Sequence, residues 1–484
     1  MTVPLFPRDV PPWVGGRALD VEKWTEVRDP YRGELAARVA VSDANVVDQA
    51  VTRAVAAQQE VAALPAYERA RILRRAADIL AGRAQELAEA ITRQTGKVLR
   101  DTTREANRAP WTLRAAATAA ETVHGTVHSS DAMPQGEGIT SISYRQPVGV
   151  VGAVTPFNAP LNLTVHKVAP AIAAGNAIVV KPASPAPITA IDLAHILEEA
   201  GLPAGAMNVV PGGPDTGSAL VGHPQINLIT FTGGPAAGEA IRRRAGFRRV
   251  LLELGGNSPN LVHHDANLTQ ACDAALRGGF ANGGQSCNSV QRLLVHRDVY
   301  QQMTALLVDG AKGLVSGDPL DPATEVGPVV NEESARRVIS WIEDAAHSGA
   351  EVLCGGSREG ALIAPTVVAG TPSTCQLFTD EIFAPVVLIN PYESLEEALE
   401  LANSTVYGLQ AAIFTSSLDV ALEAGRRLKA GGVMVNRSSN FRLDHLPYGG
   451  IGESGMGREG PMFALEEMTE LKVVVIASSE LDPR

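Results

Sequence analysis

Residues 148–253 alternate between short apolar runs and longer amphipathic segments, and this alternation limits the folds open to the chain. Apolar runs predict strands at 148–155, 176–181, 207–210, 226–231 and 250–253. Between them, apolar residues at helical spacing predict helices at 161–174, 186–200, 214–222 and 235–245. Such alternation is typical of a parallel sheet with helices on both faces. Ligands of these sheets bind beyond the carboxyl ends of the strands.

The size and charge of the chain limit the number of domains and the kinds of partner that we expect. At 484 residues it is long enough for two large domains. A net charge of −12 argues against nucleic acid or an anionic membrane as a partner. The first eight residues lack a basic segment followed by an apolar core, and no long uncharged apolar run follows, so we expect neither a secretory signal nor a membrane span.

The four cysteines do not form a metal-binding or disulfide pattern. Cys272, Cys287, Cys354 and Cys375 are scattered, with no CxxC pair and no clustered histidines. We therefore expect no metal site and no disulfide framework. Reduced thiols favour a cytoplasmic location.

A thiol, a carboxylate and an amide each occupy a turn or strand end. Cys287 follows the small-residue turn Gly283-Gly284-Gln285-Ser286, Glu253 ends the strand at 250–253, and Asn158 follows the strand at 148–155. Taken singly, a cysteine is most often a small buried hydrophobe and a glutamate is most often solvated or paired. Together they suit covalent chemistry at a carbonyl group: the thiolate attacks, the amide holds the oxyanion, and the carboxylate activates water.

A glycine-rich turn at 231–238 suggests a nucleotide site. Gly233 and Gly234 follow a strand and open a helix, with the spacing GGxxxG and not GxGxxG. Tight turns use glycine too, so the turn alone is weak. Lys181, at another strand end, would reach a ribose or a phosphate, and the two features together predict a dinucleotide site.

The remaining segments complete an expected α/β architecture. Residue 42 is predicted to cap a first helix, residues 66–95 one long second helix, and residues 101–121 a third. A second α/β region begins near 260, and 123–146 is predicted as a hairpin that serves as an oligomerisation arm or lies on the surface. The apolar tail 473–476 would pair with this hairpin or with a neighbouring chain.

Nine ordered motifs resemble the aldehyde dehydrogenase superfamily over nearly the whole chain. They are PFNAP (156–160), VVKPAS (179–184), FTGG (231–234), LELGGNSP (252–259), GQSC (284–287), EIFAPV (381–386), NSTVYGL (403–409), PYGG (447–450) and SGMGREG (454–460). The resemblance implies a Rossmann-like parallel-sheet cofactor domain at 1–122 and 147–253, a second α/β catalytic domain at 254–453, and a β-hairpin oligomerisation arm at 123–146 and 462–484. It also implies a homodimer or homotetramer.

The same resemblance implies roles for the reacting residues. Cys287 would form a thiohemiacetal, with its own N–H group and the Asn158 side chain as the oxyanion hole. Glu253 would activate water against the thioester, and Glu459 would be a second group in the proton path. The presence of Glu253 favours hydrolysis over transfer to coenzyme A.

The implied cofactor is NAD or NADP. Its expected contacts are Thr155, Pro156, Phe157, Lys181, Ser184, Gly213, Gly233, Gly234, Leu254, Glu381 and Phe383. Ser184 stands where NAD-preferring relatives often carry glutamate, so a 2′-phosphate would not be repelled. Gly234 stands where a serine often meets the pyrophosphate.

The segment 438–450 resembles the lactaldehyde and phosphonoacetaldehyde dehydrogenase subgroup. Arg442, with Arg104 or Arg108, would hold an anionic tail, because guanidinium binds carboxylate or phosphonate in a bidentate manner. Alternatively, these arginines pair with acidic neighbours such as Asp444 or Glu105. Ser286 and Ala159 stand where phosphonoacetaldehyde relatives are expected to carry arginine and histidine, which argues against that substrate.

We therefore expect an enzyme that oxidises a small polar or anionic aldehyde to its carboxylate with NAD(P)⁺. Two alternatives remain at this stage. One is a CoA-acylating semialdehyde dehydrogenase, and the other is a non-catalytic binding or structural homologue that keeps the fold.

Overall fold

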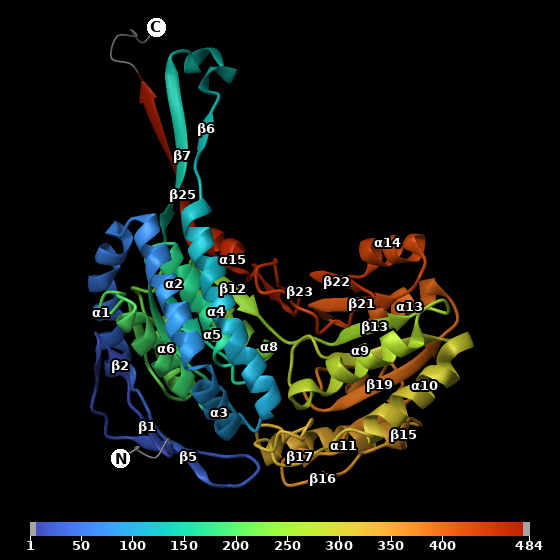
Figure 1. Cartoon of the computed structure of the whole chain (residues 1–484). Helices are drawn as coiled ribbons and strands as arrows, with labels where there is room; N and C mark the ends of the chain where they lie inside the picture. The colour runs from blue at the N-terminus through green and yellow to red at the C-terminus, as the bar shows by residue number, and fades with distance from the viewer. Residues whose placement is uncertain (1–5, 478–484) are drawn as a thin grey trace.

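The computed structural model describes residues 6–477 as two α/β lobes and a projecting β arm (Figure 1). The parts of the predicted cofactor domain at 1–5 and of the predicted arm at 478–484 lie outside the described residues. Within 6–477, no helix combines the length and the apolar character that crossing a membrane requires.

The first lobe is built on the predicted parallel sheet. Its central strands are β8 (Val150–Val154), β9 (Ala177–Lys181), β10 (Met207–Val209), β11 (Leu228–Thr232) and β12 (Arg249–Glu253). The spatial order β12-β11-β8-β9-β10 places β9 on one side of β8 and β11 on the other. The direction in which successive parallel strands are added to the sheet therefore reverses between β8 and β11. Open α/β sheets bind ligands at this position.

Short antiparallel strands close both edges of this sheet. They are β2 (Trp13–Val14) and β3 (Arg17–Ala18) beside β10, and β24 (Gly455–Met456) beside β12. A separate small sheet wraps the lobe with β1 (Arg8–Val10), β4 (Trp24–Arg28) and β5 (Leu35–Ala40). The late strand β24 brings the segment around 450–460 back to the end of β12, next to Glu253.

Helices cover both faces of the first sheet, as the alternating pattern predicts. They are α1 (Ala44–Ala63), α2 (Ala66–Gly82), α3 (Ala84–Thr95), α4 (Leu99–Thr122), α5 (Asn162–Ala173), α6 (Ile188–Glu199), α7 (Pro214–Gly222), α8 (Pro235–Arg244) and α15 (Pro461–Glu467). One large apolar core lies under α2 to α6, and a second lies under α1 and α7.

Two predictions about the first helices are wrong. The expected single helix at 66–95 is divided, because Arg83 has non-helical backbone angles (φ −109°, ψ 10°) after the weak helix former Gly82. The apolar spacing continues across this break and hides it. The cap of α1 is Asp43, whose carboxylate accepts the Val46 N–H at 2.9 Å, and not Ser42.

The second lobe contains a seven-stranded sheet in the order β15-β18-β19-β14-β13-β21-β22. Its strands are β13 (Ser258–Val262), β14 (Val290–His296), β15 (Glu351–Cys354), β18 (Thr366–Ala369), β19 (Val386–Tyr392), β21 (Gln410–Phe414) and β22 (Gly432–Val435). Strand β18 is four fully buried residues long and shows no apolar–polar alternation, so the sequence pattern does not reveal it.

The helices of the second lobe are α9 (Leu268–Phe280), α10 (Arg297–Lys312), α11 (Glu332–His347), α12 (Gln376–Thr379), α13 (Leu395–Ala402) and α14 (Leu418–Arg427). Short pairs β16 (Arg358–Glu359) with β17 (Leu362–Ile363), and β20 (Tyr407–Gly408) with β23 (Ile451–Gly452), lie outside the main sheet.

The arm is a three-stranded sheet that stands away from both lobes (Figure 1). It consists of β6 (Thr126–His128), β7 (Ile139–Pro147) and β25 (Thr469–Ala477), with two short 3₁₀ turns, η1 (Ser130–Ala132) and η2 (Pro134–Gly136). The apolar tail pairs with the hairpin along nine residues of β7. The expected arm segment from 462 begins as helix α15, which packs on α4 and α5, so the arm strand starts only at Thr469.

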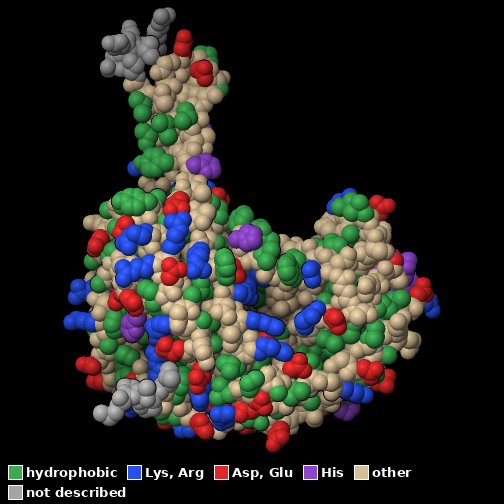
Figure 2. Space-filling view, in the orientation of Figure 1, with side chains coloured by type: hydrophobic (Ala, Val, Ile, Leu, Met, Phe, Trp, Pro, Cys, Tyr) green, Lys and Arg blue, Asp and Glu red, His purple; other side chains and the backbone are tan. Residues whose placement is uncertain are grey.

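The lobes face each other through opposite ends of their sheets. Strands of the first sheet end at Val154, Lys181, Thr232 and Glu253, whereas β13, β14 and β19 of the second sheet begin just after the LGG, GQSC and EIFAP segments. A hollow separates the lobes, and Lys and Arg side chains gather along it (Figure 2). Most of the predicted site residues lie at these facing ends.

Candidate active site

The loop before Cys287 is bent tightly. It follows the 3₁₀ turn η3 (Ala281–Gly284), and Asn282, Gly283 and Gly284 all have positive φ angles (54°, 58° and 70°). A Cβ atom on Gly284 would lie 1.9 Å from the Ala384 carbonyl oxygen, so this position requires glycine. The loop delivers the half-buried Cys287 just before β14.

Asn158 reaches the same loop from beyond the carboxyl end of β8. Its Nδ2 donates to the Gln285 carbonyl oxygen at 2.9 Å, and its own carbonyl oxygen accepts from Asn282 Nδ2 at 3.1 Å. A side-chain amide carries two N–H bonds, so the second remains able to donate to an oxyanion. The predicted nucleophile and oxyanion donor therefore share one hydrogen-bonded assembly.

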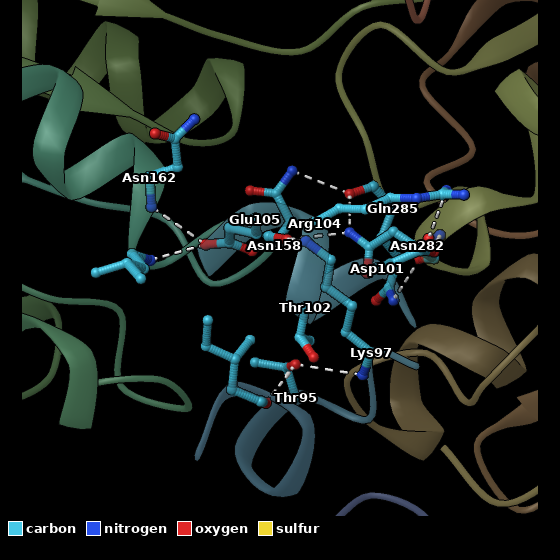
Figure 3. Close-up of polar contacts among 12 residues, drawn as sticks. Thr95, Lys97, Asp101, Thr102, Arg104, Glu105, Asn158, Asn162, Asn282 and Gln285 are labelled. Carbon is cyan, nitrogen blue, oxygen red and sulfur yellow. Dashed lines mark hydrogen bonds and ion pairs between the residues drawn. The ribbon is translucent and has the colours of Figure 1, made fainter. Parts of the chain in front are cut away.

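Charged residues just before α4 and in its first turns hold both loops in place (Figure 3). Lys97 Nζ donates to Glu105 Oε2 at 2.7 Å and to the Asn158 carbonyl oxygen at 3.1 Å. Asp101 Oδ2 accepts the Asn282 N–H at 2.9 Å. Sequence analysis gave Lys97 and Asp101 no role; the available signal was that Lys97, Asp101 and Glu105 follow one another at intervals of four residues.

A cavity of about 200 Å³ joins these residues to the predicted substrate arginines. Its lining includes Asn158, Cys287, Arg104, Arg108, Arg442 and Tyr448. Four cationic side chains, those of Lys97 and the three arginines, border it against two acidic ones, Asp101 and Glu105. The predicted nucleophile thus opens into a pocket with a cationic bias.

Two of the arginines pair with acidic residues near the mouth of the cavity. Arg108 forms a bidentate pair with Asp444, at 3.0 and 2.7 Å, as the alternative interpretation predicted. Burial acts to raise the pKa of Asp444, but hydrogen bonds from His166 and Arg108 hold it well below the ordinary value. Arg104 has a side chain that is 64% exposed and makes one contact of 3.3 Å to Asp101.

Arg442 is held differently, because it lies deep in the lobe interface. Its side chain is 11% exposed, and Nη2 donates to Glu459 Oε2 at 3.0 Å. Its guanidinium carbon lies 3.8 Å from the centre of the Tyr448 ring, a cation–π contact. Arg442 was expected to pair with Asp444 or Glu105 if it did not bind substrate, and its acidic partner is Glu459 instead.

Glu253 and Glu459 are both buried but differ in ionisation. Burial raises the pKa of Glu253 well above its ordinary value, and the charge of Glu459 raises it further. Burial also acts to raise the pKa of Glu459, but Lys167, at 3.0 Å, and Arg442 lower it to about 2. One carboxyl is thus a fixed anion and the other can hold a proton, the arrangement that acid–base sites use.

Glu253 does not line the cavity beside Cys287, although the two residues are close enough for Glu253 to influence the thiol electrostatically. Its Oε2 is buried without a hydrogen-bond partner among the described residues. A Cβ atom on Gly449 would lie 2.9 Å from Glu253 Oε1, so this glycine leaves room for the carboxylate.

The thiol of Cys287 is unfavourably placed for ionisation without help. Burial raises its pKa to about 12, and the hydrogen bond with Tyr448 acts in the opposite direction. The Sγ and the Tyr448 hydroxyl lie 3.3 Å apart. Sequence analysis quoted the PYGG motif but gave Tyr448 no role, since an aromatic residue before two glycines has no periodic or charge signal.

The predicted dinucleotide contacts gather at the carboxyl edge of the first sheet. Gly213 and Gly234 are the N-caps of α7 and α8, and a Cβ atom on either would meet nothing within 4 Å. Helix starts with open space before them suit phosphate groups. Lys181 ends β9 nearby, and burial lowers its pKa to about 8. These residues fit a dinucleotide.

Other predicted cofactor residues connect this edge to the cavity. The Ser184 hydroxyl donates to the Gly212 carbonyl oxygen at 3.0 Å. Thr155 and Pro156 follow β8, the Gly233 N–H donates to the Glu253 carbonyl oxygen at 3.0 Å, and Leu254 directly follows β12.

Glu381 and Phe383 come from the second lobe. Glu381 Oε1 accepts the Gly256 N–H at 2.9 Å, and burial raises the pKa of this carboxyl to about 7. Phe383 has a left-handed backbone (φ 57°), which is unusual for a bulky residue and common at functional sites. Its ring meets that of Phe157 edge-on with centres 6.0 Å apart. These contacts bring the facing ends of both sheets together.

Comparison with known protein families decides what this arrangement is. Residues 13–474 match the model described as "Aldehyde dehydrogenase family". The chain belongs to the aldehyde dehydrogenase family. It is therefore an NAD(P)-dependent oxidoreductase that oxidises an aldehyde to the acid, and the expected family and fold are confirmed.

Three similar proteins illustrate the range of this family. A 3-sulfolactaldehyde dehydrogenase from Priestia aryabhattai is 40% identical over 465 residues, covering 96% of this chain and 97% of its own. Aldehyde dehydrogenase 21 from Physcomitrella patens, solved with its product succinate, has a TM-score of 0.95 at 36% identity, covering 98% and 99%. The glyceraldehyde-3-phosphate dehydrogenase GapN from Methanocaldococcus jannaschii, solved with NADP, has a TM-score of 0.91 at 37% identity, covering 95% and 100%.

Proposed function

We propose that this aldehyde dehydrogenase oxidises a small aldehyde carrying an anionic group, through a covalent intermediate on Cys287. The observation that carries the proposal is the cavity that joins Cys287 and Asn158 to Arg104, Arg108 and Arg442. Guanidinium groups that border a narrow cavity favour carboxylate, sulfonate or phosphate. The names of the three similar proteins point the same way, since they refer to sulfolactaldehyde, succinate and glyceraldehyde-3-phosphate.

The proposed chemistry begins at the thiol. The sulfur of Cys287 attacks the aldehyde carbon, and the carbonyl π electrons move to oxygen, where Asn158 Nδ2 and the Cys287 N–H donate to the oxyanion. NAD(P)⁺, when bound, accepts the hydride that leaves this thiohemiacetal carbon. The acid is then released from the thioester by water.

Glu253 is the proposed base for that water. Its raised pKa lets it take a proton from water and pass it on, whereas Glu459 keeps its charge beside Lys167 and Arg442. We place Glu459 beside the proton path as a fixed anion whose charge adds to the effect of burial and raises the pKa of Glu253 further. Water as the acyl acceptor makes the product a carboxylate and not a coenzyme A thioester.

The proposed contacts for the cofactor are the residues at the facing sheet ends. Lys181 and Ser184 would meet the adenosine ribose, Gly233 and Gly234 the pyrophosphate, and Glu381 and Phe383 the nicotinamide side. No carboxylate of residues 6–477 forms an ion pair with Lys181. A lysine beside Ser184 accepts a 2′-phosphate, so we propose that NADP is used as well as NAD.

We also propose that the arm makes the enzyme a homodimer or homotetramer. The strands β6, β7 and β25 expose the apolar side chains of Val127, Leu471, Val473, Val475 and Ile476. An exposed apolar strand is a surface that another chain can cover. Sedimentation of the intact chain would reveal the predicted assembly, and a monomer would refute it. A cytoplasmic location stays a prediction.

A panel of aldehydes of matched length tests the main proposal. We expect reduction of NAD(P)⁺ with a kcat/KM about tenfold or more higher for aldehydes ending in carboxylate or sulfonate than for uncharged ones, the factor that one charge-assisted contact contributes. Cys287→Ala should abolish the reduction, with Cys354→Ala as the matched control. Equal rates with Cys287→Ala and the unaltered enzyme would refute thiol catalysis, and no preference for anions would refute the substrate class.

A further inference from the structure

The hydroxyl of Tyr448 lies against the sulfur on which the proposed function depends. Its oxygen is 3.3 Å from Cys287 Sγ, within hydrogen-bonding distance for sulfur. Among residues 6–477, this is the hydrogen bond that the Cys287 side chain makes. Tyr448 is 5% exposed, so water does not compete freely for its hydroxyl.

The position of the Tyr448 ring is fixed from two directions. Its backbone exchanges two hydrogen bonds with Glu459, with the Tyr448 N–H donating at 3.0 Å and the Glu459 N–H donating at 2.7 Å. The Arg442 guanidinium covers the ring at 3.8 Å and is itself held by Glu459 Oε2 at 3.0 Å. Glu459 therefore anchors both the tyrosine and the cation stacked on it.

The surroundings of the Cys287 sulfur disfavour the thiolate, so a hydrogen-bond donor is needed to stabilise it. Burial opposes the thiolate, and the carboxyl groups of Glu381 and Glu253 oppose it further. Arg442 and the Tyr448 hydroxyl act in favour of the thiolate. Of these two, Tyr448 touches the sulfur directly, whereas Arg442 acts through space and through the ring.

We propose that Tyr448 is a catalytic residue whose hydroxyl donates a hydrogen bond to the Cys287 thiolate, and that Arg442 is a positioning residue that holds and polarises the tyrosine. The inference rests on the proposed use of Cys287 as the nucleophile. A cation over the ring draws electron density from the phenol and makes its O–H a better donor.

The bond acts whenever the sulfur carries negative charge. Before attack, the hydrogen bond from Tyr448 stabilises the thiolate. The hydrogen bond weakens as an electron pair of the sulfur forms the bond to the aldehyde carbon. During hydrolysis the carbon–sulfur bond breaks, its electron pair returns to sulfur, and the water proton passes to Glu253. Tyr448 then stabilises the departing thiolate without giving up its own proton.

The variant Tyr448→Phe removes the hydroxyl and keeps the ring beneath Arg442. At saturating NAD(P)⁺, we expect the rising limb of kcat/KM against pH to move upward by about one to two pH units, the effect of a hydrogen bond to a charged group. Tyr300→Phe is the matched control, since its hydroxyl lies 3.5 Å from the Ile389 carbonyl oxygen in the second lobe. A lower profile with an unmoved midpoint would assign Tyr448 a structural role and overturn the proposal.

Alkylation of Cys287 by iodoacetamide, followed by peptide mass spectrometry, measures the thiol without any aldehyde. At pH 8 we expect Tyr448→Phe to react about four- to fifteen-fold more slowly, because fewer thiolates form and their higher intrinsic nucleophilicity compensates only in part. An equal or faster rate would overturn the proposal. A Tyr448-dependent rate in an enzyme that oxidises no aldehyde would refute the proposed function and leave this inference standing.

Discussion

The inner end and the mouth of the cavity hold their arginines in opposite ways. At the inner end, Arg442 is 11% exposed, paired with Glu459 and stacked on Tyr448. At the mouth, Arg104 is 64% exposed and has one long contact to Asp101. Arg108 is intermediate, since it is 45% exposed but clamped by Asp444 at two points.

This difference separates two functions that one residue type could serve. A buried guanidinium paired with a buried carboxylate cannot exchange that partner freely for a ligand, and its removal takes away one of the cations that compensate the carboxylate. An exposed guanidinium with a weak partner can exchange that partner for an anionic substrate. We therefore assign substrate binding mainly to Arg104 and support of the nucleophile to Arg442, although sequence analysis grouped them together.

Replacing Arg442 should have the largest effect on stability. Arg442→Met leaves Glu459 with Lys167 as its remaining cation, so we expect a loss of about 3–5 kcal/mol, the usual cost of breaking a buried ion pair. Arg104→Met, the matched substitution at the mouth, should change stability by no more than about 0.5 kcal/mol. Urea unfolding monitored by fluorescence compares the two, and equal losses would remove the distinction between the two ends.

Replacing Asn158 should have the largest effect on the chemical step. Asn158→Ala removes one of the proposed oxyanion donors, so kcat should fall by about 10²- to 10³-fold. Asn390→Ala is the control, because its amide donates to the Thr371 carbonyl oxygen at 2.8 Å within the second lobe. A fall in kcat of the same size in both variants, or an effect on KM alone, would contradict the assignment of Asn158.

The release of product should depend on pH through Glu253. Because its pKa is raised, the carboxyl is protonated at low pH and cannot accept a proton from water. Hydrolysis of the thioester should therefore speed up with rising pH, about tenfold per unit below the raised pKa, and level off above it. Single-turnover kinetics measure this limb, which should be absent from Glu253→Gln. If the rise of the hydrolysis rate with pH persisted in Glu253→Gln, it would have to be assigned to another group.

Replacing Arg104 should have the smallest effect and the most selective one. For an anionic aldehyde, Arg104→Gln should raise KM by about tenfold with kcat nearly unchanged, because the lost contact is the same in the ground state and the transition state. KM for an uncharged aldehyde of the same length should not change. Steady-state kinetics with both aldehydes, at low and at physiological salt, measure these effects. An equal loss of kcat/KM for the two aldehydes would show that Arg104 is merely structural.

The sequence predicted the layout of the site because parallel sheets place their strand ends together. Thr155, Lys181 and Glu253 follow apolar runs separated by helices, and this order alone brings them to one edge. The Cys287 loop could be placed beside that edge only through the family resemblance, since its strand belongs to a different sheet.

The partners of the charged side chains could not be predicted in the same way. Arg108 pairs with Asp444, which lies 336 positions away in the sequence, and Lys167 pairs with Glu459, which lies 292 positions away. No local sequence pattern predicts pairs at such separations. Arg442 and Glu459 lie only 17 positions apart, but their contact depends on β24 returning the chain to the first sheet. Side-chain pairing is decided by tertiary packing, which spacing does not reveal.

Direct detection of the acyl enzyme tests the central claim that Cys287, Asn158 and Glu253 act on one carbonyl. Glu253→Gln should be mixed with NAD(P)⁺ and an anionic aldehyde, quenched within one turnover, and analysed by intact and peptide mass spectrometry. The account predicts a stoichiometric acyl group on Cys287 that accumulates in this variant and not in the unaltered enzyme. Formation of the reduced cofactor with no adduct on Cys287 would contradict it.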